Sequence, residues 1–269
     1  MVRSFLAVTI ALMLLITTSG CNNNPSVPSP APGAEIAKPA VVPAELASIA
    51  LDVKAAGLHK LQATAPTGKV VKYAIWVPKQ LPKDKKVPLV MALHYAGKDT
   101  DHYGAGLIEA LYQPACDELG AIIVAPDSLT GDDWDNPTNL DYVAWLTRSA
   151  IQSYPIDEKK VILSGFSAGG IGTWFIAARA DGLFTAAVPV AGRPNLKGAE
   201  MTIPLCAVHS EADTICLPGP TKAAVAKLSG GPKKSNIILL TDGTTHYTAG
   251  AYVKPLRKAF AWVVGTWNS

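Results

Sequence analysis

The chain has 269 residues, of which 49% are hydrophobic and 17% are charged, and its formal net charge is +3. This size and composition fit one globular domain with a sizeable core and exclude a disordered or fibrous chain. The positive charge is mild and the lysines are scattered, so nothing indicates nucleic acid as a partner.

The first 20 residues have the pattern of an export signal. A positive charge at Arg3 precedes a short apolar run from Phe5 to Ile16, and small residues follow it. The apolar run is too short to cross the hydrocarbon core of a bilayer comfortably. We therefore expect a signal peptide over residues 1–20 rather than a membrane span.

The end of this segment carries a more specific pattern. Residues 17–21 read Thr-Thr-Ser-Gly-Cys, which resembles the lipobox of bacterial lipoproteins, although Thr18 stands where leucine is more usual. The resemblance implies acylation of Cys21 and a membrane anchor. Asn22 follows where aspartate would signal inner-membrane retention, which implies the outer membrane, on its periplasmic or surface face. A plain secretory signal is the alternative.

Residues 21–44 are dominated by proline, alanine, asparagine and serine and contain almost no large apolar side chains. This composition predicts a tether, semi-rigid where proline repeats, that holds a globular domain of residues 45–269 away from a membrane surface.

Three cysteines remain in the predicted domain, namely Cys116, Cys206 and Cys216. An odd number leaves at least one thiol unpaired in an exported protein. Cys206 and Cys216 are near enough in sequence to form a disulfide, and buried free thiols are the equal alternative. Because no C-x-x-C pair or His/Cys cluster occurs, the sequence predicts no metal and no cofactor.

The domain opens with two alternating segments, 58–64 and 70–77, around a turn at 66–68, which predicts an antiparallel hairpin at a sheet edge. Short apolar runs then alternate with helical segments. Strands are expected at 87–93, 121–125, 161–164, 186–190, 205–208 and 237–240, and helices near 105–119, 139–153, 221–228 and 252–267. This order predicts an α/β fold, with a mostly parallel eight-stranded sheet and helices on both faces.

Ser167 lies in the G-x-S-x-G sequence of residues 165–169. Small neighbours let the backbone turn sharply and expose a hydroxyl above the sheet. The apolar strand 161–163 precedes this turn, and residues 171–178 follow it with the spacing of a helix that has one apolar face. The context predicts a nucleophile elbow, with an ordinary glycine-rich turn as the alternative.

Two further polar loops follow later strands. Asp213 comes after the strand ending at 208, and His246 comes after the strand ending near 240. The order Ser, Asp, His places a nucleophile, an orienting acid and a base at the carboxyl ends of strands, where reactive groups collect in such sheets. Glu211 and Asp242 are the competing acids, and a helix-capping role is the alternative for Asp213.

The other four histidines do not occupy such a loop. His59 lies in the hairpin, His102 in a polar loop, His94 beside the third strand and His209 at a strand end. Only His246 is placed to act as the base.

An acyl-transfer site also needs donors for an oxyanion. The N–H of Ala168, directly after the predicted nucleophile, meets the first requirement, and the loop of residues 93–97 occupies the second place. Within that loop we name Ala96 first and Tyr95 second. His94 is expected to orient the loop through a hydrogen bond or to contact the substrate.

These motifs together resemble an α/β-hydrolase. The run from Tyr154 to Val161, leading into residues 165–170, is similar to the polyhydroxybutyrate depolymerase and feruloyl or acetylxylan esterase group. The similarity covers most of residues 70–267 and implies a serine esterase with the triad Ser167, Asp213 and His246.

The segment 191–202 is too short to hold a cap domain, which predicts access for bulky, polymeric or polysaccharide-linked esters. Trp134 either offers an aromatic wall to a sugar or aryl acid or packs as a loop anchor. The nearby Asp132, Asp133 and Asp135 lack an EF-hand pattern, so we expect a solvated loop rather than calcium.

The sequence therefore predicts a surface-tethered serine carboxylic ester hydrolase. Among enzymes, the alternative is a serine peptidase of the prolyl-oligopeptidase type, which shares the triad. From another class, the alternative is a non-catalytic cell-surface binding protein with the same fold.

Overall fold

The computed structural model describes residues 46–97, 99–229 and 234–268, so the predicted signal peptide, Cys21 and the tether lie outside the described residues. One eight-stranded sheet has the order β1-β2-β4-β3-β5-β6-β7-β8. Its strands are β1 (Gly57–Thr64), β2 (Val70–Val77), β3 (Val87–Leu93), β4 (Ile122–Pro126), β5 (Ile156–Phe166), β6 (Ala186–Val190), β7 (Leu205–Ser210) and β8 (Ser235–Leu240).

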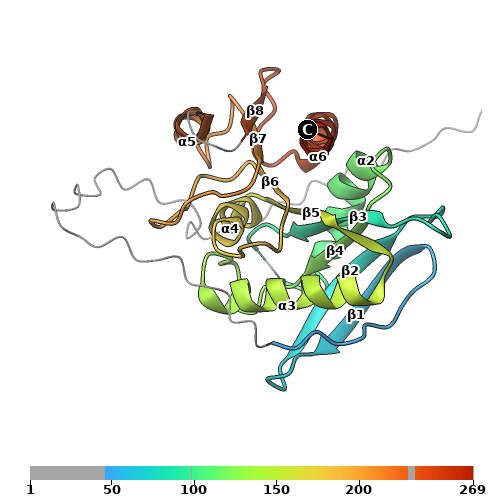
Figure 1. Ribbon diagram of the computed structural model, residues 1–269. Coiled ribbons are helices and arrows are strands. Elements are labelled where there is room, and N and C mark those ends of the chain that lie inside the picture. Colours follow the sequence, from blue (N-terminus) through green and yellow to red (C-terminus); the bar gives the residue numbers. More distant parts are fainter. Residues whose placement is uncertain (1–45, 98, 230–233, 269) are drawn as a thin grey trace, which may run out of the picture.

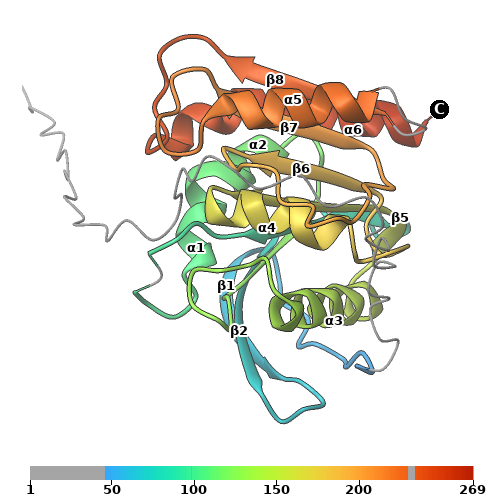
Figure 2. The same cartoon turned by 90° about the vertical axis from the view of Figure 1, so that its left-hand side faces the viewer.

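The strand directions confirm the predicted architecture. β1 and β2 form an antiparallel hairpin, and β2 runs antiparallel to β4, whereas all the other neighbouring strands are parallel. The hairpin lies at one edge of the sheet and β8 at the other, as Figure 2 shows.

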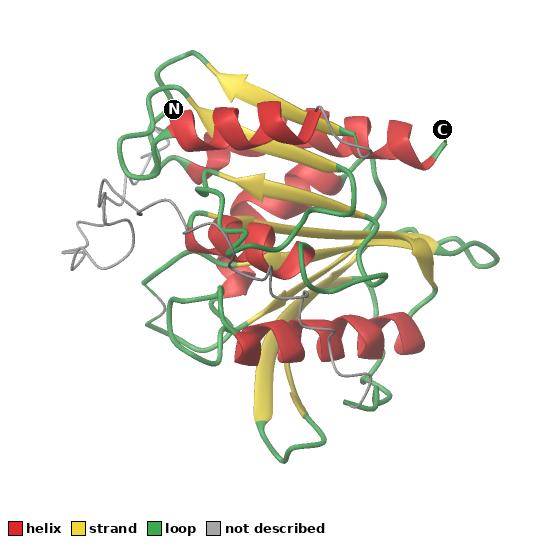
Figure 3. Ribbon diagram, turned by 60° about the vertical axis from the view of Figure 1, so that its left-hand side comes forward, coloured by secondary structure: helices red, strands yellow, loops and turns green. Residues whose placement is uncertain are grey.

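Helices cover both faces of the sheet. The helices are α1 (Gly104–Leu107), the π-helical turn η1 (Ile108–Tyr112), α2 (Gln113–Cys116), α3 (Pro137–Ser153), α4 (Ala168–Ala177), α5 (Pro218–Ser229), the 3-10 helix η2 (Ala249–Tyr252) and α6 (Val253–Trp267). Figures 1 and 3 show helices on either side of the sheet. One core lies under α3, α4 and α5, and a second lies under α1, η1, α2 and α6. Within the described ranges, no helix is long and apolar enough to cross a membrane.

The expected single helix at 105–119 is wrong in detail. The structure has a π-helical turn at Ile108–Tyr112, and the helical elements end at Cys116. Pro114 comes shortly after this π-helical turn and has no N–H to donate to the helical turn before it. The π-helical segment therefore replaces the regular α-helical hydrogen-bond pattern just before the proline.

Several strands are longer than expected, and two of them bear on the site. β5 begins at Ile156 instead of 161, and β7 continues through His209 to Ser210. His209 and Ser210 are polar but fully buried, so their polarity marks no strand end. The extension of β7 carries buried polar groups to the carboxyl edge of the sheet, where the loops after β3, β5, β7 and β8 meet.

Candidate active site

Ser167 sits in a strained turn between β5 and α4, with φ of 56° and ψ of −113°. A non-glycine residue with positive φ is costly and persists where its surroundings enforce it. Two glycines do so here. A Cβ on Gly165 would lie 2.2 Å from the carbonyl oxygen of Gly169, and one on Gly169 would lie 2.1 Å from that of Leu93. The elbow therefore requires glycine at both positions.

The structure brings Ser167, His246 and Asp213 into one hydrogen-bonded chain. Ser167 Oγ lies 2.8 Å from His246 Nε2, and His246 Nδ1 lies 2.7 Å from Asp213 Oδ2. Because a carboxylate only accepts, the imidazole proton sits on Nδ1 and Nε2 is left to accept the serine hydroxyl proton. This tautomer is the one that a general base needs.

Asp213 is buried and held by its own turn. Its Oδ1 accepts hydrogen bonds from the backbone N–H groups of Ile215 and Cys216, both at 2.9 Å. Burial raises the pKa of Asp213, but hydrogen bonds from His209 and His246 outweigh this and hold the pKa well below its usual range. The carboxyl group is therefore ionised at neutral pH.

The competing acids have other partners. Glu211 pairs with Lys222 at 2.5 Å, and Asp242 Oδ1 accepts the hydroxyl and backbone N–H of Thr244 at 2.6 and 3.1 Å. Of the three acids that the sequence left open, Asp213 is the one in hydrogen-bond contact with His246.

The loops that carry Asp213 and His246 are joined directly. Ser210, at the end of β7, donates its hydroxyl proton to the Thr244 carbonyl in the loop after β8, at 2.6 Å. The His246 ring also packs against Phe166, with 5.7 Å between ring centroids. The acid and the base are thus fixed relative to each other and to the elbow.

The buried rings of Trp134 and His94 hydrogen-bond to the backbone of the loop after β3. Trp134 Nε1 donates to the His94 carbonyl at 2.8 Å, and His94 Nδ1 lies 2.7 Å from the Tyr95 carbonyl. His94 Nε2 accepts the Ser128 N–H at 3.1 Å, so Nδ1 is the donor to Tyr95.

These contacts orient the predicted oxyanion donors. In a trans peptide the N–H points opposite to the preceding C=O, and no cis peptide occurs in the described residues. The N–H groups of Tyr95 and Ala96 therefore point away from the rings that hold the carbonyls. The close approach of Gly169 to Leu93 sets this loop against the start of α4, where the first N–H groups, including that of Ala168, lack helical partners.

Two predicted substrate contacts are wrong. Trp134 is 1% exposed and His94 is fully buried, so neither side chain presents a surface to a substrate. A Cβ on Gly172 would lie 2.2 Å from Trp134 Cβ, which shows how closely the indole packs on α4. Trp134 is the packed loop anchor, and His94 orients the loop.

The acidic loop around Trp134 is paired within the protein. Asp132 accepts the Gly97 N–H at 2.8 Å, and Asp135 pairs with Lys197 at 3.0 Å. Within the described ranges, no group of three His, Cys, Asp or Glu side chains is arranged to hold a metal ion.

The cysteines settle the open question of a disulfide. Cys206 and Cys216 do not bridge, and both thiols are buried, as is that of Cys116. The prediction of at least one unpaired thiol is confirmed, because all three of these cysteines are free.

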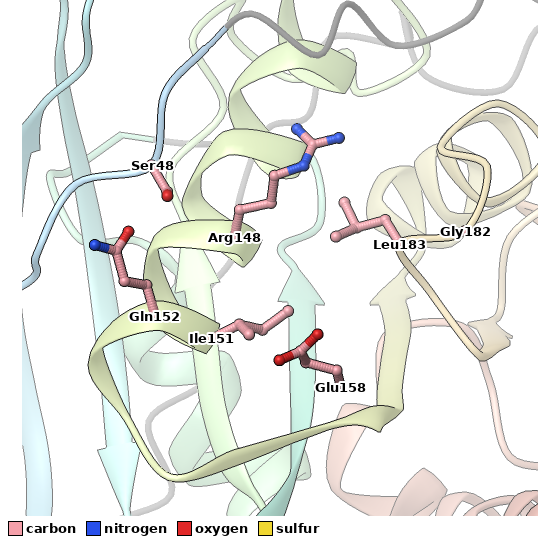
Figure 4. A pocket seen from close by; sticks show the side chains of 7 residues that line it. All are labelled: Ser48, Arg148, Ile151, Gln152, Glu158, Gly182 and Leu183. Atoms are coloured by element: carbon pink, nitrogen blue, oxygen red, sulfur yellow. The ribbon is translucent and has the colours of Figure 1, made fainter.

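A surface pocket elsewhere does not belong to this site. It lies at the start of β5 and before β6, the amino ends of parallel strands, whereas reactive groups collect at the carboxyl ends. Figure 4 shows its lining, which comprises Ser48, Arg148, Ile151, Gln152, Glu158, Gly182 and Leu183.

The connection between β6 and β7 is short and lies flat. Residues 191–204 contain no helix or strand. Arg179, two residues after the end of α4, donates to the carbonyls of Leu196 and Lys197, at 2.5 and 3.2 Å, and holds the connection against the end of that helix. No cap domain is inserted at this position.

Comparison with curated proteins finds esterases of low identity. The chain is 29% identical over 134 residues to the bifunctional acetylxylan esterase/xylanase XynS20E of Neocallimastix patriciarum and 27% identical over 135 residues to acetylxylan esterase A of Emericella nidulans. The matches cover 48% and 46% of this chain but 19% and 43% of the relatives, so the chain spans less than half of their length. No protein-family model matches the chain.

Solved structures show the fold. A thermostable esterase superposes with a TM-score of 0.61 at 24% identity, covering 77% of this chain and 62% of its own. The Staphylococcus aureus serine hydrolase FphF gives 0.62 at 15% identity, with 78% and 99% covered. The Pyrococcus horikoshii acylaminoacyl peptidase gives 0.56 at 13% identity, with 79% and 42% covered.

These comparisons confirm the predicted resemblance to α/β-hydrolase serine esterases and the predicted fold class. The chain has the α/β-hydrolase fold, with a hydrogen-bonded Ser-His-Asp arrangement at the carboxyl edge of its sheet.

Proposed function

We propose that this chain is a serine carboxylic ester hydrolase that works through a covalent acyl-enzyme, with Ser167 as nucleophile, His246 as base and Asp213 as orienting acid. The observation that carries the proposal is the continuous hydrogen-bonded chain from Ser167 Oγ through His246 to Asp213, with distances of 2.8 and 2.7 Å. Such a chain activates a hydroxyl that is otherwise a poor nucleophile at neutral pH.

The reaction has two balanced halves. Ser167 Oγ attacks the ester carbonyl carbon while His246 Nε2 takes the hydroxyl proton. The tetrahedral intermediate then loses its alkoxy group, which leaves as an alcohol with that proton. In the second half, a water molecule loses a proton to His246 and attacks the acyl-enzyme. Ser167 recovers the proton as the acid is released.

The developing oxyanion needs backbone donors. We assign these to the N–H of Ala168 and the N–H of Ala96, with Tyr95 as the second candidate in the same loop. Trp134 and His94 hydrogen-bond to the His94 and Tyr95 carbonyls of this loop, which supports a preorganised site.

For the substrate we propose either ester groups carried by polysaccharides or the ester bonds of polyesters. The support is the similarity to acetylxylan esterases and the absence of a cap between β6 and β7. Tyr247 replaces Trp134 as the proposed aromatic contact. The residue is 67% exposed and its ring centroid lies 5.6 Å from that of His246, and an exposed aromatic side chain beside the triad suits a sugar or aryl group.

Hydrolysis of p-nitrophenyl acetate and butyrate by residues 45–269 tests this function, with Ser167→Ala as the matched control. The proposal predicts turnover by the wild type and only background hydrolysis by the variant. Equal rates in both proteins contradict it.

A serine peptidase is the second candidate, because the fold is shared with an acylaminoacyl peptidase, although the match covers only 42% of that chain. The matching p-nitroanilides separate the two candidates. Faster cleavage of the anilides than of the esters favours the peptidase. If the folded wild type cleaves neither the esters nor the anilides, the remaining candidate is a non-catalytic binding protein.

We also propose that Cys21 carries a lipid that anchors the protein at the outer membrane. The support is the segment of residues 1–21 with its apolar run and its small residues before the cysteine. In the full-length protein, Cys21→Ser is expected to release the protein from the membrane fraction. Unchanged membrane retention contradicts this proposal.

A further inference from the structure

His209 is a fully buried polar residue that the triad itself does not include. It lies four residues before Asp213 and is the second-to-last residue of strand β7. Its Nε2 lies 2.6 Å from the carbonyl oxygen of Cys216 and 3.4 Å from Asp213 Oδ2. That carboxylate oxygen is the one that His246 contacts.

The partners of His209 fix its protonation. A carbonyl oxygen only accepts, so Nε2 carries a proton. Nδ1 is buried and has no hydrogen-bond partner among the described residues. A proton on Nδ1 would bury a donor that has no hydrogen-bond partner, which is more costly than leaving a lone pair unpaired. His209 is therefore neutral, with its proton on Nε2.

The neutral ring closes the turn that holds the acid. The N–H groups of Ile215 and Cys216 bind Asp213 Oδ1, and the carbonyl of Cys216 binds His209 Nε2. His209 thus ties the far end of this turn back to β7. Asp213 Oδ2 is left facing His246.

We infer that His209 is a positioning residue that acts through Asp213, and this inference rests on the proposed function. By clamping the Cys216 carbonyl it stops rotation of the carboxylate. By remaining neutral it leaves the charge of Asp213 to stabilise the His246 imidazolium that forms during catalysis.

The groups that face Asp213 are few. They are His246 from the loop after β8, Tyr252 from η2, and His209 and Cys216 from β7 and its following turn. Burial raises the pKa of Tyr252 first, and the nearby Asp213 raises it further, so the phenol stays neutral. No second fixed charge among these groups competes for the carboxylate.

A matched pair of amides tests the role. The side-chain nitrogen of His209→Gln reaches the place of Nε2 and keeps a donor for Cys216, whereas that of His209→Asn is one methylene too short. For His209→Asn we expect kcat per titrated active site to fall about 10- to 100-fold, with KM nearly unchanged. The acid limb of kcat/KM should move to lower pH, because a loosened Asp213 stabilises protonated His246 less. His209→Gln should restore both properties.

Counting active sites with a phosphonate separates positioning from misfolding. If the two variants have the same kcat per titrated site and the same acid limb, His209 has no positioning role and the inference is wrong. If the wild type hydrolyses no ester, the proposed function fails first.

A second measurement does not depend on turnover or on a variant that folds. Nitrogen-15 NMR of the wild type at neutral pH should show His209 with a protonated Nε2 and an unprotonated Nδ1. In the same protein, the His246 Nδ1 proton should resonate at low field. A His209 that is protonated at both nitrogens at neutral pH overturns the inference.

Discussion

The two sides of the candidate site are held in different ways. On the acid–base side, the side chains of Ser167, His246 and Asp213 bond directly to one another. On the oxyanion side, the loop after β3 offers backbone N–H groups, and the buried rings of Trp134 and His94 hold its carbonyls from beneath.

This difference explains why one side was easier to predict. Side-chain catalysis requires particular residue types, and their order along the chain exposes them. Any residue except proline can supply a backbone N–H donor, so the sequence does not show which residue does so. Only the side chains that hold the donor loop in place belong to particular residue types. The polar atoms of Trp134 and His94 do that work from inside the protein, out of the substrate's reach.

The substitution of Asp213 should reduce kcat more than any other change considered below. Asp213→Asn keeps the shape of the side chain but removes the charge and favours the wrong His246 tautomer, so we expect kcat to fall about 10⁴-fold near neutral pH. Ester hydrolysis by the folded variant measures this. Asp242→Asn is the control, because Asp242 bonds within its own loop, and its rate should stay within about twofold of the wild type.

A smaller effect is expected from the oxyanion side. Trp134→Phe keeps an aromatic ring but removes the N–H that binds the His94 carbonyl, so we expect kcat to fall about tenfold with KM little changed. The unpaired buried carbonyl should also lower the free energy of unfolding by about 1–3 kcal/mol. Steady-state kinetics and urea unfolding measure the two effects.

The control for that change is Trp267→Phe. The Trp267 indole donates to Thr185 at 3.2 Å, away from the loop after β3. If both variants lose the same fraction of kcat, the orienting role of Trp134 is wrong.

The charge of Asp213 should also appear in stability. Its pKa is depressed in the folded state, so its ionised form stabilises the fold above the unfolded pKa of about 3.9, and this is lost as the pH falls toward the folded value. Wild type and Asp213→Asn should therefore differ by about 1 kcal/mol less at pH 3 than at pH 5. Urea unfolding at both values measures the gap. A gap that is constant with pH contradicts a depressed pKa.

The smallest effect is expected at Glu211. This acid pairs with Lys222 at a partly exposed position, and such pairs contribute little. Glu211→Gln should keep kcat/KM within about twofold of the wild type. A loss as large as that of Asp213→Asn would make Glu211 the functional acid instead.

Much of the fold was predictable because periodicity reports burial. The hairpin, the buried parallel strands and the elbow helix all appear where their apolar patterns indicate. The patterns failed where backbone chemistry or buried polarity intervened. Pro114 follows a π-helical turn in the expected helix, and the polar residues His209 and Ser210 continue β7 inside the core.

The placement of the site residues divides in the same way. The order of Ser167, Asp213 and His246 predicted their proximity, because successive parallel strands end at one edge. The burial of Trp134 could not be predicted, because it depends on the close approach of Gly172 across the fold. His209 had one sequence signal, its position four residues before Asp213. That spacing has meaning only once the turn between them is known.

Covalent labelling identifies the nucleophile. Residues 45–269 are treated with an alkyl fluorophosphonate, and the adduct is located by mass spectrometry of the intact protein and its peptides. We expect one adduct per chain, on Ser167, and no adduct in Ser167→Ala. An adduct on another residue, or a folded wild type that takes up no label, would show that Ser167 is not the activated nucleophile.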